Sequence, residues 1–468
     1  MVFVEVRHSR YFPPRSKPQG GNTLDEVAKA YVHRCLAGDD GLTDAAAAAR
    51  QELPERFARR WGEWMMPRPL FIENDVIYRF SDDLSALFHL MVSIPHRLFD
   101  GDLGAYCAAV GIDARRARLM SMLDGPPPLF GRADAYHDGT GLKVLEYNIG
   151  SELGGIDTAA LAAAWMDVPA FASFANQYRM AYVDTGLQLA HTLRAAAAEL
   201  TGGVDPVVAL IEPDGCINDY LAASLSFQSM LCEFGLETLL GEVSDLTERN
   251  GRLHLNGRRI DVVLRYFTED EVLADPDGEQ AIEPIIRAHQ DGRVVLWTTL
   301  RSKLFASKGC LALLSDSRCR DALTHAEREL VDRLLPWTRT LVAGTTEVDG
   351  QVMDLFDYCH ESRTHLVLKP KLGHSGHGII AGWRTSDAAW RQALTDLAGS
   401  GYVVQQRVLP RPETMVSSLT GEPEVWHTTW SSFVMPNGFA GTSARTLDLD
   451  NDSQLRRVTP VFHYPATS

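Results

Sequence analysis

A pair of alternating polar and apolar segments on either side of a tight turn places the strongest constraint on how this chain can fold. Residues 131–148 contain both segments, separated by an Asp-Gly turn. This pattern is typical of a β-hairpin. Because successive side chains of a strand point to opposite faces, Glu146 and Asn148 would share one face. The partner strand would bring Asp134 beside them, so the pattern predicts a polar face that the rest of the fold must accommodate.

The three side chains of this face are suitable ligands for Mg²⁺. This ion prefers oxygen ligands and takes only a few from protein, with the remainder from phosphates and water. Glu-x-Asn alone is weak evidence, since residues 248–250 show the same pattern in a polar turn. Residues 146–148 differ from this second occurrence because they belong to the predicted hairpin, which brings Asp134 beside them. We therefore predict that Asp134, Glu146 and Asn148 bind metal, the alternative being solvated residues at a strand end.

A second segment, more than two hundred residues downstream, has the composition of a phosphate-binding loop. An apolar run from His365 ends in Lys369 and is followed by a glycine-rich turn and a returning strand at 379–382. Glycines let backbone N–H groups approach phosphate oxygens, and lysine adds positive charge. The Walker pattern is absent from the sequence, which excludes a P-loop NTPase. An ordinary glycine-rich hairpin is the alternative to phosphate binding by Lys369, Lys371, Gly373, Gly376 and Gly378.

Residues 401–408 read as a strand that runs into a polar hinge. Backbone groups of such a hinge can bind the edge of adenine, which makes Gln405, Gln406 and Val408 candidate nucleotide-binding residues. Glu413, a few positions later, is a candidate acceptor for ribose hydroxyls. Plain sheet edge is the alternative for each of them.

Together these segments resemble the ATP-grasp superfamily, which includes D-alanine:D-alanine ligase and glutathione synthetase. In that family ATP lies between two α+β subdomains, and an Asp with a Glu-x-Asn holds two Mg²⁺ ions. The resemblance implies that ATP and Mg²⁺ are the cofactors. It matches Lys369 to the lysine strand and residues 405–408 to the hinge. It also matches Arg132 to the arginine that steadies the acyl phosphate and tetrahedral intermediate, although a surface charge on a strand is the alternative.

The order of the segments departs from the usual family pattern, because the metal strand precedes the lysine strand and hinge. The sequence after the hinge contains no second Glu-x-Asn. Circular permutation explains this order, since domain termini often lie close together at the surface. We therefore predict an α+β, circularly permuted ATP-grasp fold. The chain resembles the permuted group that includes glutathionylspermidine synthase and related bacterial peptide ligases, over roughly residues 66 to 465.

The middle of the chain is expected to form a small parallel α/β unit, because apolar strands alternate there with a helical pattern. The expected elements are strands at 207–211, 236–240, 260–267 and 294–297 and a helix from about 219 to 234. The expected domains are an N-terminal mainly helical region (1–65), the metal-binding half of the core with helices (66–200), a Rossmann-like pre-ATP-grasp substrate domain (201–300) and the nucleotide-binding subdomain with the remainder of the core (301–468).

The resemblance suggests roles for further residues. Lys303 and Lys308 follow the last strand of the α/β unit, and one of them is expected to contact phosphate, with Lys308 preferred. Arg265 is a candidate for a substrate carboxylate or phosphate, with a purely structural role as the alternative. Arg445 is expected to approach the γ-phosphate, where a guanidinium would stabilise charge, and a solvated strand arginine is the alternative. The glycine-rich turn after the metal strand is expected to approach substrate closely, with Ser151 and Gly154 as its candidate residues; a helix N-cap is the alternative.

Composition narrows the class of protein. The 468 residues are 45% hydrophobic and 23% charged, which is typical of a globular chain of two or three domains. A net charge of −16 argues against a nucleic-acid or anionic membrane partner. Seven scattered cysteines read as reduced thiols, so a cytoplasmic location is expected. The sequence shows no secretory signal and no apolar stretch of membrane-spanning length.

The expected reaction is ATP-dependent joining of a carboxylate to an amine. A small-molecule or peptide carboxylate would attack the γ-phosphorus to give an acyl phosphate and ADP, and an amine would then displace phosphate. Two alternatives remain open: a small-molecule kinase on the same fold and a nucleotide-binding scaffold without turnover. The sequence does not identify the carboxylate or the amine. A homodimer is one candidate assembly of the chain.

Overall fold

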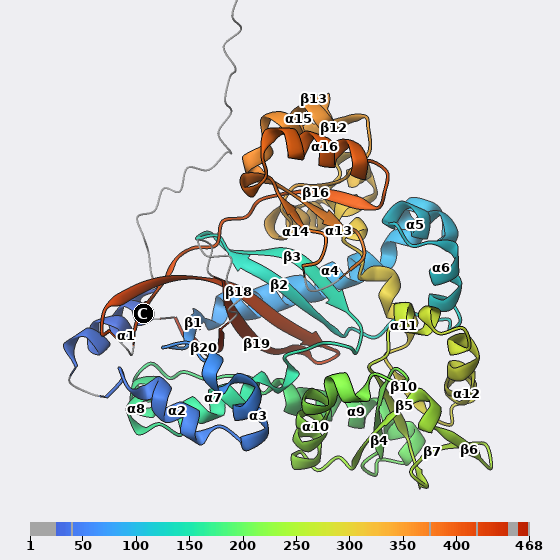
Figure 1. The fold of residues 1–468 in the computed structure, drawn as a ribbon, viewed down its shortest axis with the longest axis horizontal. Helices are drawn as coiled ribbons and strands as arrows, with labels where there is room; N and C mark the ends of the chain where they lie inside the picture. The colour runs from blue at the N-terminus through green and yellow to red at the C-terminus, as the bar shows by residue number, and fades with distance from the viewer. Residues whose placement is uncertain (1–24, 39–40, 374–375, 418–419, 448–456, 467–468) are drawn as a thin grey trace, which may run out of the picture.

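The computed structural model describes residues 25–38, 41–373, 376–417, 420–447 and 457–466. Residues 1–24 of the predicted N-terminal helical region lie outside this part of the chain. The described residues of the predicted N-terminal helical region form short helices that pack together at one end of the molecule (Figure 1). These helices are α1 (Glu26–Ala37), α2 (Ala45–Glu52) and α3 (Glu55–Trp61).

The central sheet combines strands from both ends of the chain. Its strand order is β1-β20-β19-β18-β2-β3, and β17 pairs with β18. The predicted hairpin is confirmed as β2 and β3, and β2 pairs antiparallel with the C-terminal strand β18. The strands are β1 (Leu70–Glu73), β2 (Gly131–His137), β3 (Leu142–Ile149), β17 (Glu413–Val416), β18 (Pro423–Met435), β19 (Gly438–Leu447) and β20 (Val458–Tyr464).

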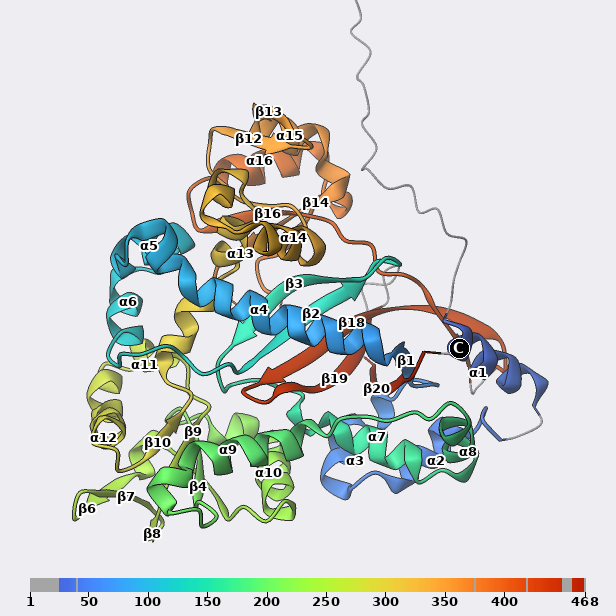
Figure 2. The same ribbon diagram turned by 180° about the vertical axis from the view of Figure 1, so that it is seen from behind.

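The long helix α4 (Asn74–Phe99) covers one face of this sheet, as Figure 2 shows from behind. Its apolar residues, such as Leu84 and Leu87, pack with Ala133, Val144 and Tyr147 of the hairpin in one buried core. The helices on the other side pack mainly under β18, β19 and β20. The polar face of β2 and β3 is therefore left clear of them. The other helices between β1 and the α/β unit are α5 (Leu103–Val110), α6 (Ala114–Met120), α7 (Ala159–Met166), α8 (Pro169–Gln177) and α9 (Thr185–Thr201).

The predicted parallel α/β unit is present. Its sheet has the order β10-β9-β4-β5, with every pair parallel. Parallel strands that are buried on both faces require apolar runs, and all four residues of β9 are buried. The elements are β4 (Val208–Glu212), α10 (Ile217–Glu233), β5 (Thr238–Glu242), β9 (Val262–Arg265), α11 (Glu269–Ala274), α12 (Gly278–Gln290) and β10 (Val295–Trp297), with a small sheet of β6 (Thr247–Arg249), β7 (Arg252–Leu255) and β8 (Arg258–Arg259).

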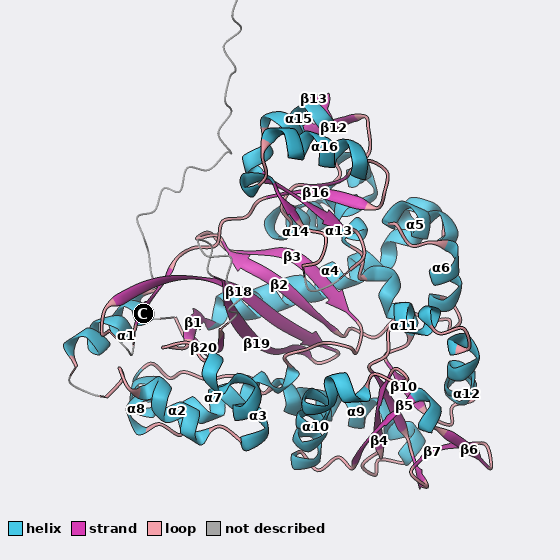
Figure 3. Ribbon diagram, viewed as in Figure 1, coloured by secondary structure: helices cyan, strands magenta, loops and turns pink. Residues whose placement is uncertain are grey.

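A third unit sits above the hairpin and carries the lysine strand and the hinge (Figure 3). Its sheet has the order β11-β16-β14-β15, in which β14 and β16 pair antiparallel. From β11 onwards it has a separate apolar core around Trp390 and Leu368, whereas apolar residues of the preceding helices, such as Leu311 and Leu330, pack in one core with α4 and the hairpin. The elements are the 3₁₀ segment η4 (Leu300–Phe305), α13 (Lys308–Ser315), α14 (His325–Leu334), β11 (Thr338–Thr340), β12 (Thr345–Val348), β13 (Gln351–Asp354), α15 (Leu355–Glu361), β14 (Leu366–Pro370), β15 (Ile380–Ala381), α16 (Asp387–Leu397) and β16 (Tyr402–Gln406).

Within the described ranges, no single helix is long and apolar enough to cross a membrane. One bent pair, Ile156–Met166 with Pro169–Gln177, meets the criteria of length and composition when taken together.

Candidate functional site

The polar face of the hairpin has the register that the alternation predicts. Arg132 pairs with Asn148 and Asp134 pairs with Glu146 across the two strands. All four are partly exposed, whereas the alternate residues of β2 are buried against α4. A bulge follows Asp134 in the pairing, and such irregularities commonly re-aim side chains beside functional sites. The three predicted metal ligands therefore lie together with Arg132 on one face.

Asp134 is held by three neighbouring side chains. Arg132 donates through Nε and Nη2 to the two carboxylate oxygens, at 3.0 and 2.7 Å. Ser431 of β18 donates to Oδ1 at 2.7 Å, and Asn148 donates to Oδ2 at 3.3 Å. Burial would lower the pKa of Arg132, but the charges of Asp134 and Glu146 raise it. The guanidinium is therefore a fixed positive charge beside the carboxylates.

Glu146 joins the hairpin to the third unit. Its Oε2 lies 3.1 Å from Nζ of Lys308, the first residue of α13. Its Oε1 accepts from Asn148 at 3.2 Å. Burial would raise the pKa of Glu146, but the positive charges of Lys308 and Lys369 lower it to about 2. The carboxylate is thus ionised at neutral pH, with two cations from another unit beside it.

Lys369 is buried on β14, where its Nζ donates to Oε1 of Gln405 at 2.7 Å. The same amide donates to Oγ1 of Thr338 at 3.1 Å. Burial lowers the pKa of Lys369 to about 8, although the charge of Glu146 raises it. The Gln405 side chain therefore positions the ammonium of Lys369. The pKa of this ammonium lies close to neutral pH, so a moderate rise in pH removes its charge.

The glycine-rich loop requires glycine at its predicted positions. Gly373, Gly376 and Gly378 have φ of 118°, 77° and 73°, a region that other residues rarely adopt. The Gly373 carbonyl accepts from Nζ of Lys308 at 3.3 Å, so this lysine lies between the loop and Glu146. Phosphate binding by the three glycines stays a prediction.

Lys371 lies elsewhere. Its Nζ donates at 2.8 Å to the carbonyl of Ala109, in the last turn of α5. Cations are favoured at a helix carboxyl end. Its side chain also packs so closely on Gly111 that a Cβ there would come within 2.7 Å of its Cδ. Lys371 thus holds the loop against α5, and its contact with phosphate stays a prediction.

The hinge after β16 is fixed on both sides. The N–H of Gln406 donates to the carbonyl of Trp337, and that of Arg407 to the carbonyl of His365, both at 2.8 Å. The N–H of Val408 has no hydrogen-bond partner among the described residues. A backbone donor at Val408 is what recognition of an adenine edge would require.

Glu413 lies in a buried ion-pair network. It is 2% exposed, and its two carboxylate oxygens accept from Arg68 and Arg411, each at 2.9 Å. Burial would raise the pKa of Glu413, but these two guanidinium groups lower it. Both oxygens are engaged in this ion-pair network, and the ribose contact of Glu413 stays a prediction.

Arg445 of β19 is brought to the turn that follows the metal strand. A Cβ built on Gly155 would lie 3.6 Å from its Nη2. The adjacent Gly154 carbonyl accepts from Nη1 of Arg132 at 2.8 Å. The two predicted arginines therefore flank the same turn, and Gly154 contributes its backbone carbonyl there.

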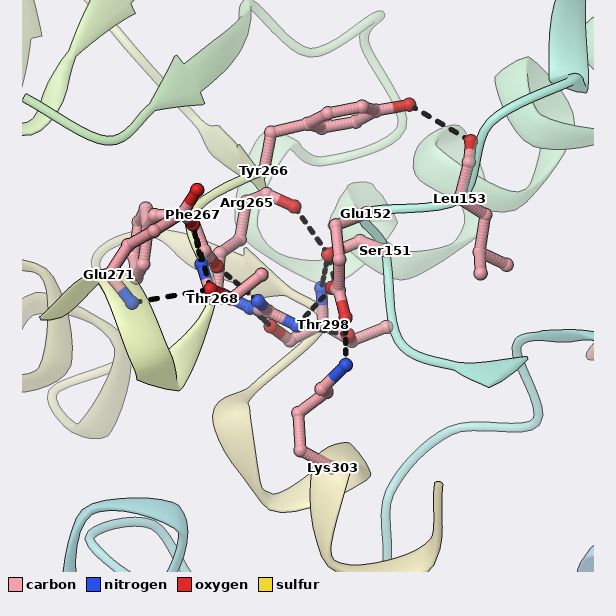
Figure 4. Close-up of polar contacts among 10 residues, drawn as sticks. All are labelled: Ser151, Glu152, Leu153, Arg265, Tyr266, Phe267, Thr268, Glu271, Thr298 and Lys303. Carbon is pink, nitrogen blue, oxygen red and sulfur yellow. Dashed lines mark hydrogen bonds and ion pairs between the residues drawn. The ribbon is translucent and has the colours of Figure 1, made fainter. Parts of the chain in front are cut away.

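Arg265 and Ser151 are internal supports, as Figure 4 shows. Arg265 has no exposed surface, and its guanidinium donates to Oε2 of Glu152, to the Phe267 carbonyl and to both oxygens of Thr298. The Ser151 hydroxyl donates to the Arg265 carbonyl at 2.6 Å and accepts from the N–H of Thr298 at 3.0 Å. These hydrogen bonds give both residues a structural role, and their contacts with substrate stay a prediction.

The structure separates the two candidate phosphate lysines. Lys308 lies beside Glu146 and the glycine-rich loop. Lys303 donates instead to Oε1 of Glu152, at 2.7 Å. Burial would lower the pKa of Lys303, but Glu152 and Glu269 raise it. Lys308 is therefore the lysine that lies beside the predicted metal ligands, and its contact with phosphate stays a prediction.

Sequence reasoning missed two residues of the site. Ser431 lies within a 13-residue strand that carries no motif, and its register opposite Asp134 is what reveals it. Glu152 stands four positions after Asn148. A carboxylate so close to a predicted metal strand is a signal that could have been used.

The oxygen ligands fit Mg²⁺, with one rearrangement. No group of three or more His, Cys, Asp or Glu side chains suitable for a metal occurs in the described part of the chain. The set here is two carboxylates and an amide, which suits an ion that takes its other ligands from phosphate and water. Asn148 directs its NH₂ towards both carboxylates. Turning the amide over would present its oxygen to a metal instead.

Comparison with known proteins gives a fold. No family model matches the chain, and no curated protein matches it by sequence. Among solved structures it is similar to a glutathione synthetase-like effector from Globodera pallida, with a TM-score of 0.56 and 12% identity over 95% of this chain and 99% of the other. A proposed gamma-glutamylcysteine synthetase from Methylobacillus flagellatus gives a TM-score of 0.39 and 13% identity over 76% and 84% of the two chains. The first comparison shows that the chain shares a mixed α/β fold with a glutathione synthetase-like protein.

Proposed function

We propose that this protein is an ATP-dependent ligase that joins a carboxylate to an amine and releases ADP and phosphate. The proposal rests mainly on one observation: the predicted metal ligands lie beside the predicted phosphate-binding lysines. Asp134, Glu146 and Asn148 face Lys308 and Lys369, which come from a different unit of the fold. Phosphoryl transfer from a nucleotide requires carboxylates that bind a metal ion and, opposite them, cations that neutralise the phosphates.

The topology supports a permuted ATP-grasp arrangement. The metal-bearing hairpin comes early in the chain, yet it pairs with β18 from the last part of the chain in one continuous sheet. The lysine strand and the hinge strand are neighbours in a second sheet. The similarity to a glutathione synthetase-like fold agrees with this arrangement.

In the first step, the substrate carboxylate would attack the γ-phosphorus of ATP, and the bond to the β–γ bridging oxygen would break to release ADP. Lys308 and Lys369 would neutralise the phosphates. Asp134, Glu146 and Asn148 would hold Mg²⁺, which when bound neutralises phosphate charge and aligns the phosphate oxygens. The glycine-rich loop would keep water from the acyl phosphate.

In the second step, the amine nitrogen would attack the acyl carbon, lose a proton and expel phosphate to form an amide bond. Arg132 is oriented for this step by its paired contacts with Asp134 and the Gly154 carbonyl. Its charge would stabilise the oxyanion of the tetrahedral intermediate. Arg445, on the other side of the same turn, would stabilise charge on the transferred phosphoryl group.

A screen for ADP release tests the proposal. The purified chain is incubated with ATP, Mg²⁺ and pools of amino acids, peptides and polyamines, and products are identified by mass. We expect ADP, phosphate and an amide only when a carboxylate and an amine are both present. A phosphorylated product without amide would instead identify a small-molecule kinase. Absence of ADP with every pool would indicate a binding protein without turnover.

Substitution of the metal ligands provides the matched control. Glu146→Gln should reduce amide formation by about 10²-fold or more, because the remaining set loses one of its two carboxylates and electrostatic groups of this kind typically contribute that much. Glu248→Gln changes the other Glu-x-Asn sequence, whose carboxylate pairs with Arg287 at the surface. We expect Glu248→Gln to retain full activity, and equal loss in both variants would contradict the site.

A further inference from the structure

The carboxyl end of α5 and the amino end of α13 meet beside the proposed site. The last carbonyl groups of a helix have no partner within that helix and need donors from elsewhere. In α5, the carbonyls of the last two residues, Ala109 and Val110, accept from side chains that are distant in the sequence. The donors are Nζ of Lys371, at 2.8 Å, and Oγ of Ser307, at 2.7 Å. Two residues from outside α5 therefore complete its carboxyl end.

The Ser307 hydroxyl serves both helices. While it donates to the Val110 carbonyl, it accepts from the N–H of Gly309 at 3.0 Å and is thereby the N-cap of α13. A hydroxyl has one donor and two acceptor positions, so one side chain can make both contacts. Ser307 is buried, and the residue that directly follows it, as the first residue of α13, is Lys308.

Lys371 anchors the same residue from the other side. Its carbonyl accepts from the N–H of Lys308 at 2.9 Å. Its own N–H donates to the Gly401 carbonyl at 2.7 Å, which extends the pairing of β14 with β16 by one step. Lys371 thus joins three elements: its N–H continues the sheet of the third unit, its carbonyl binds the start of α13, and its ammonium binds the end of α5.

The residue between these two anchors is the lysine at the centre of the proposed site. The Lys308 ammonium lies 3.1 Å from Oε2 of Glu146 and donates to the Gly373 carbonyl at 3.3 Å. A long side chain reaches two such partners only from a fixed backbone position. Groups that act on a reacting phosphate are sensitive to this position, because a displacement of about 1 Å can reduce a rate about 10²-fold.

We infer that Ser307 and Lys371 are positioning residues, which hold Lys308 between Glu146 and the glycine-rich loop. The inference rests on the proposed function, in which Lys308 neutralises phosphate. Positioning requires no contact of Ser307 or Lys371 with the nucleotide. It therefore differs from a direct contact of Lys371 with phosphate and from a role in folding alone, since only positioning depends on the presence of Lys308.

A double-mutant cycle separates these roles. Lys371→Met keeps an apolar side chain of similar length and removes the ammonium that binds α5. Calorimetry with a nonhydrolysable ATP analogue and Mg²⁺ should show about tenfold weaker binding, as for loss of one charge-assisted hydrogen bond. In a Lys308→Met background the same change should weaken binding less than about threefold, because residues that act together are not additive. Unchanged affinity in Lys371→Met, or equal factors in both backgrounds, would overturn the inference.

Ser307→Ala tests the junction without any change of charge. It should weaken analogue binding about as much as Lys371→Met, and again by a much smaller factor in the Lys308→Met background. Ser302→Ala is the matched control, because it removes another buried hydroxyl, one without a hydrogen-bond partner among the described residues. We expect Ser302→Ala to bind like the unaltered chain, and equal loss in both serine variants would overturn the inference. Should Lys371→Met fail to fold, Ser307→Ala takes its place in every experiment.

A crystal structure of Lys371→Met tests the inference without nucleotide. We expect Nζ of Lys308 to leave its 3.1 Å contact with Glu146, while the hydrogen bond from Asn148 to Glu146 is kept. Lys308 in its original place would overturn the inference. Failure of the unaltered chain to bind the ATP analogue would contradict the ligase proposal, and the position of Lys308 in the variant would then decide the inference alone.

Discussion

At the scale of single residues, the proposed site depends on lysines that keep their charge in a buried place. Lys369 and Lys308 both lower the pKa of Glu146, and Glu146 in turn raises the pKa of Lys369. Burial is the stronger influence on Lys369, so its pKa falls to about 8. The affinity of the site for phosphate should therefore depend on pH just above neutrality.

The expected pH dependence has a definite sign. Below pH 8 Lys369 is protonated and attracts phosphate; as pH rises through about 8 it loses its proton and this attraction. Affinity for an ATP analogue should then fall by up to about tenfold per pH unit, the limit for one linked proton. Calorimetry across this range measures it. Lys369→Arg stays charged throughout and should remove the dependence; the same decline in that variant would assign the titration elsewhere.

At the scale of elements, Arg265 tests whether the end of β9 is a support or a ligand-binding position. Arg265→Ala should destabilise the chain by about 3–5 kcal/mol, because it leaves Glu152 with a broken buried ion pair. Arg258→Ala removes a solvent-exposed partner of Glu237 from the same unit and should change unfolding little. Urea denaturation compares them. A stable Arg265→Ala variant with weakened substrate binding would restore the role predicted from sequence.

The packing of α13 on α5 fixes the position of Lys308. A Cβ at Gly309 would lie 2.7 Å from the carbonyl oxygen of Val110 and 2.8 Å from its Cα. Gly309→Ala should therefore push the two elements apart, at about 1–3 kcal/mol for overpacking, and weaken ATP-analogue binding by moving Lys308. At Gly62 the added Cβ would meet only Ala58 at 3.9 Å. Gly62→Ala should leave binding unchanged, and an unaffected Gly309→Ala would show that this packing does not position the lysine.

The sequence predicted what depends on local pattern and missed what depends on distant partners. Alternation and an Asp-Gly turn sufficed to place Asp134, Glu146 and Asn148 on one face, because both strands are adjacent in sequence. Glu413 is a candidate for ribose because it follows the hinge, and no local pattern predicts its ion pair with Arg68, which stands 345 positions away. A charged residue near a strand end looks the same whether it faces a ligand or a buried partner. The contacts of Lys371 with Ala109 and of Arg265 with Glu152 are likewise made between distant parts of the sequence.

At the scale of the whole molecule, the two halves of the proposed site are built from different units. The central sheet joins the early hairpin to the C-terminal strands, while the lysine strand and hinge belong to the unit above it (Figures 1 and 2). The ion pair of Lys308 with Glu146 and the hydrogen bond from Lys143 to the Arg333 carbonyl are among the contacts that link these units. A nucleotide and its metal would strengthen this link, since they contact both sides.

The most direct test of the proposed site is a crystal structure with a nonhydrolysable ATP analogue and Mn²⁺ in place of Mg²⁺. Anomalous scattering then locates the metal independently of the model of the nucleotide. The account predicts manganese on Asp134, Glu146 and Asn148, with the phosphates at Lys308 and Lys369 and the adenine edge at Val408. Manganese on other residues, or a nucleotide bound away from the junction of the two units, would contradict it.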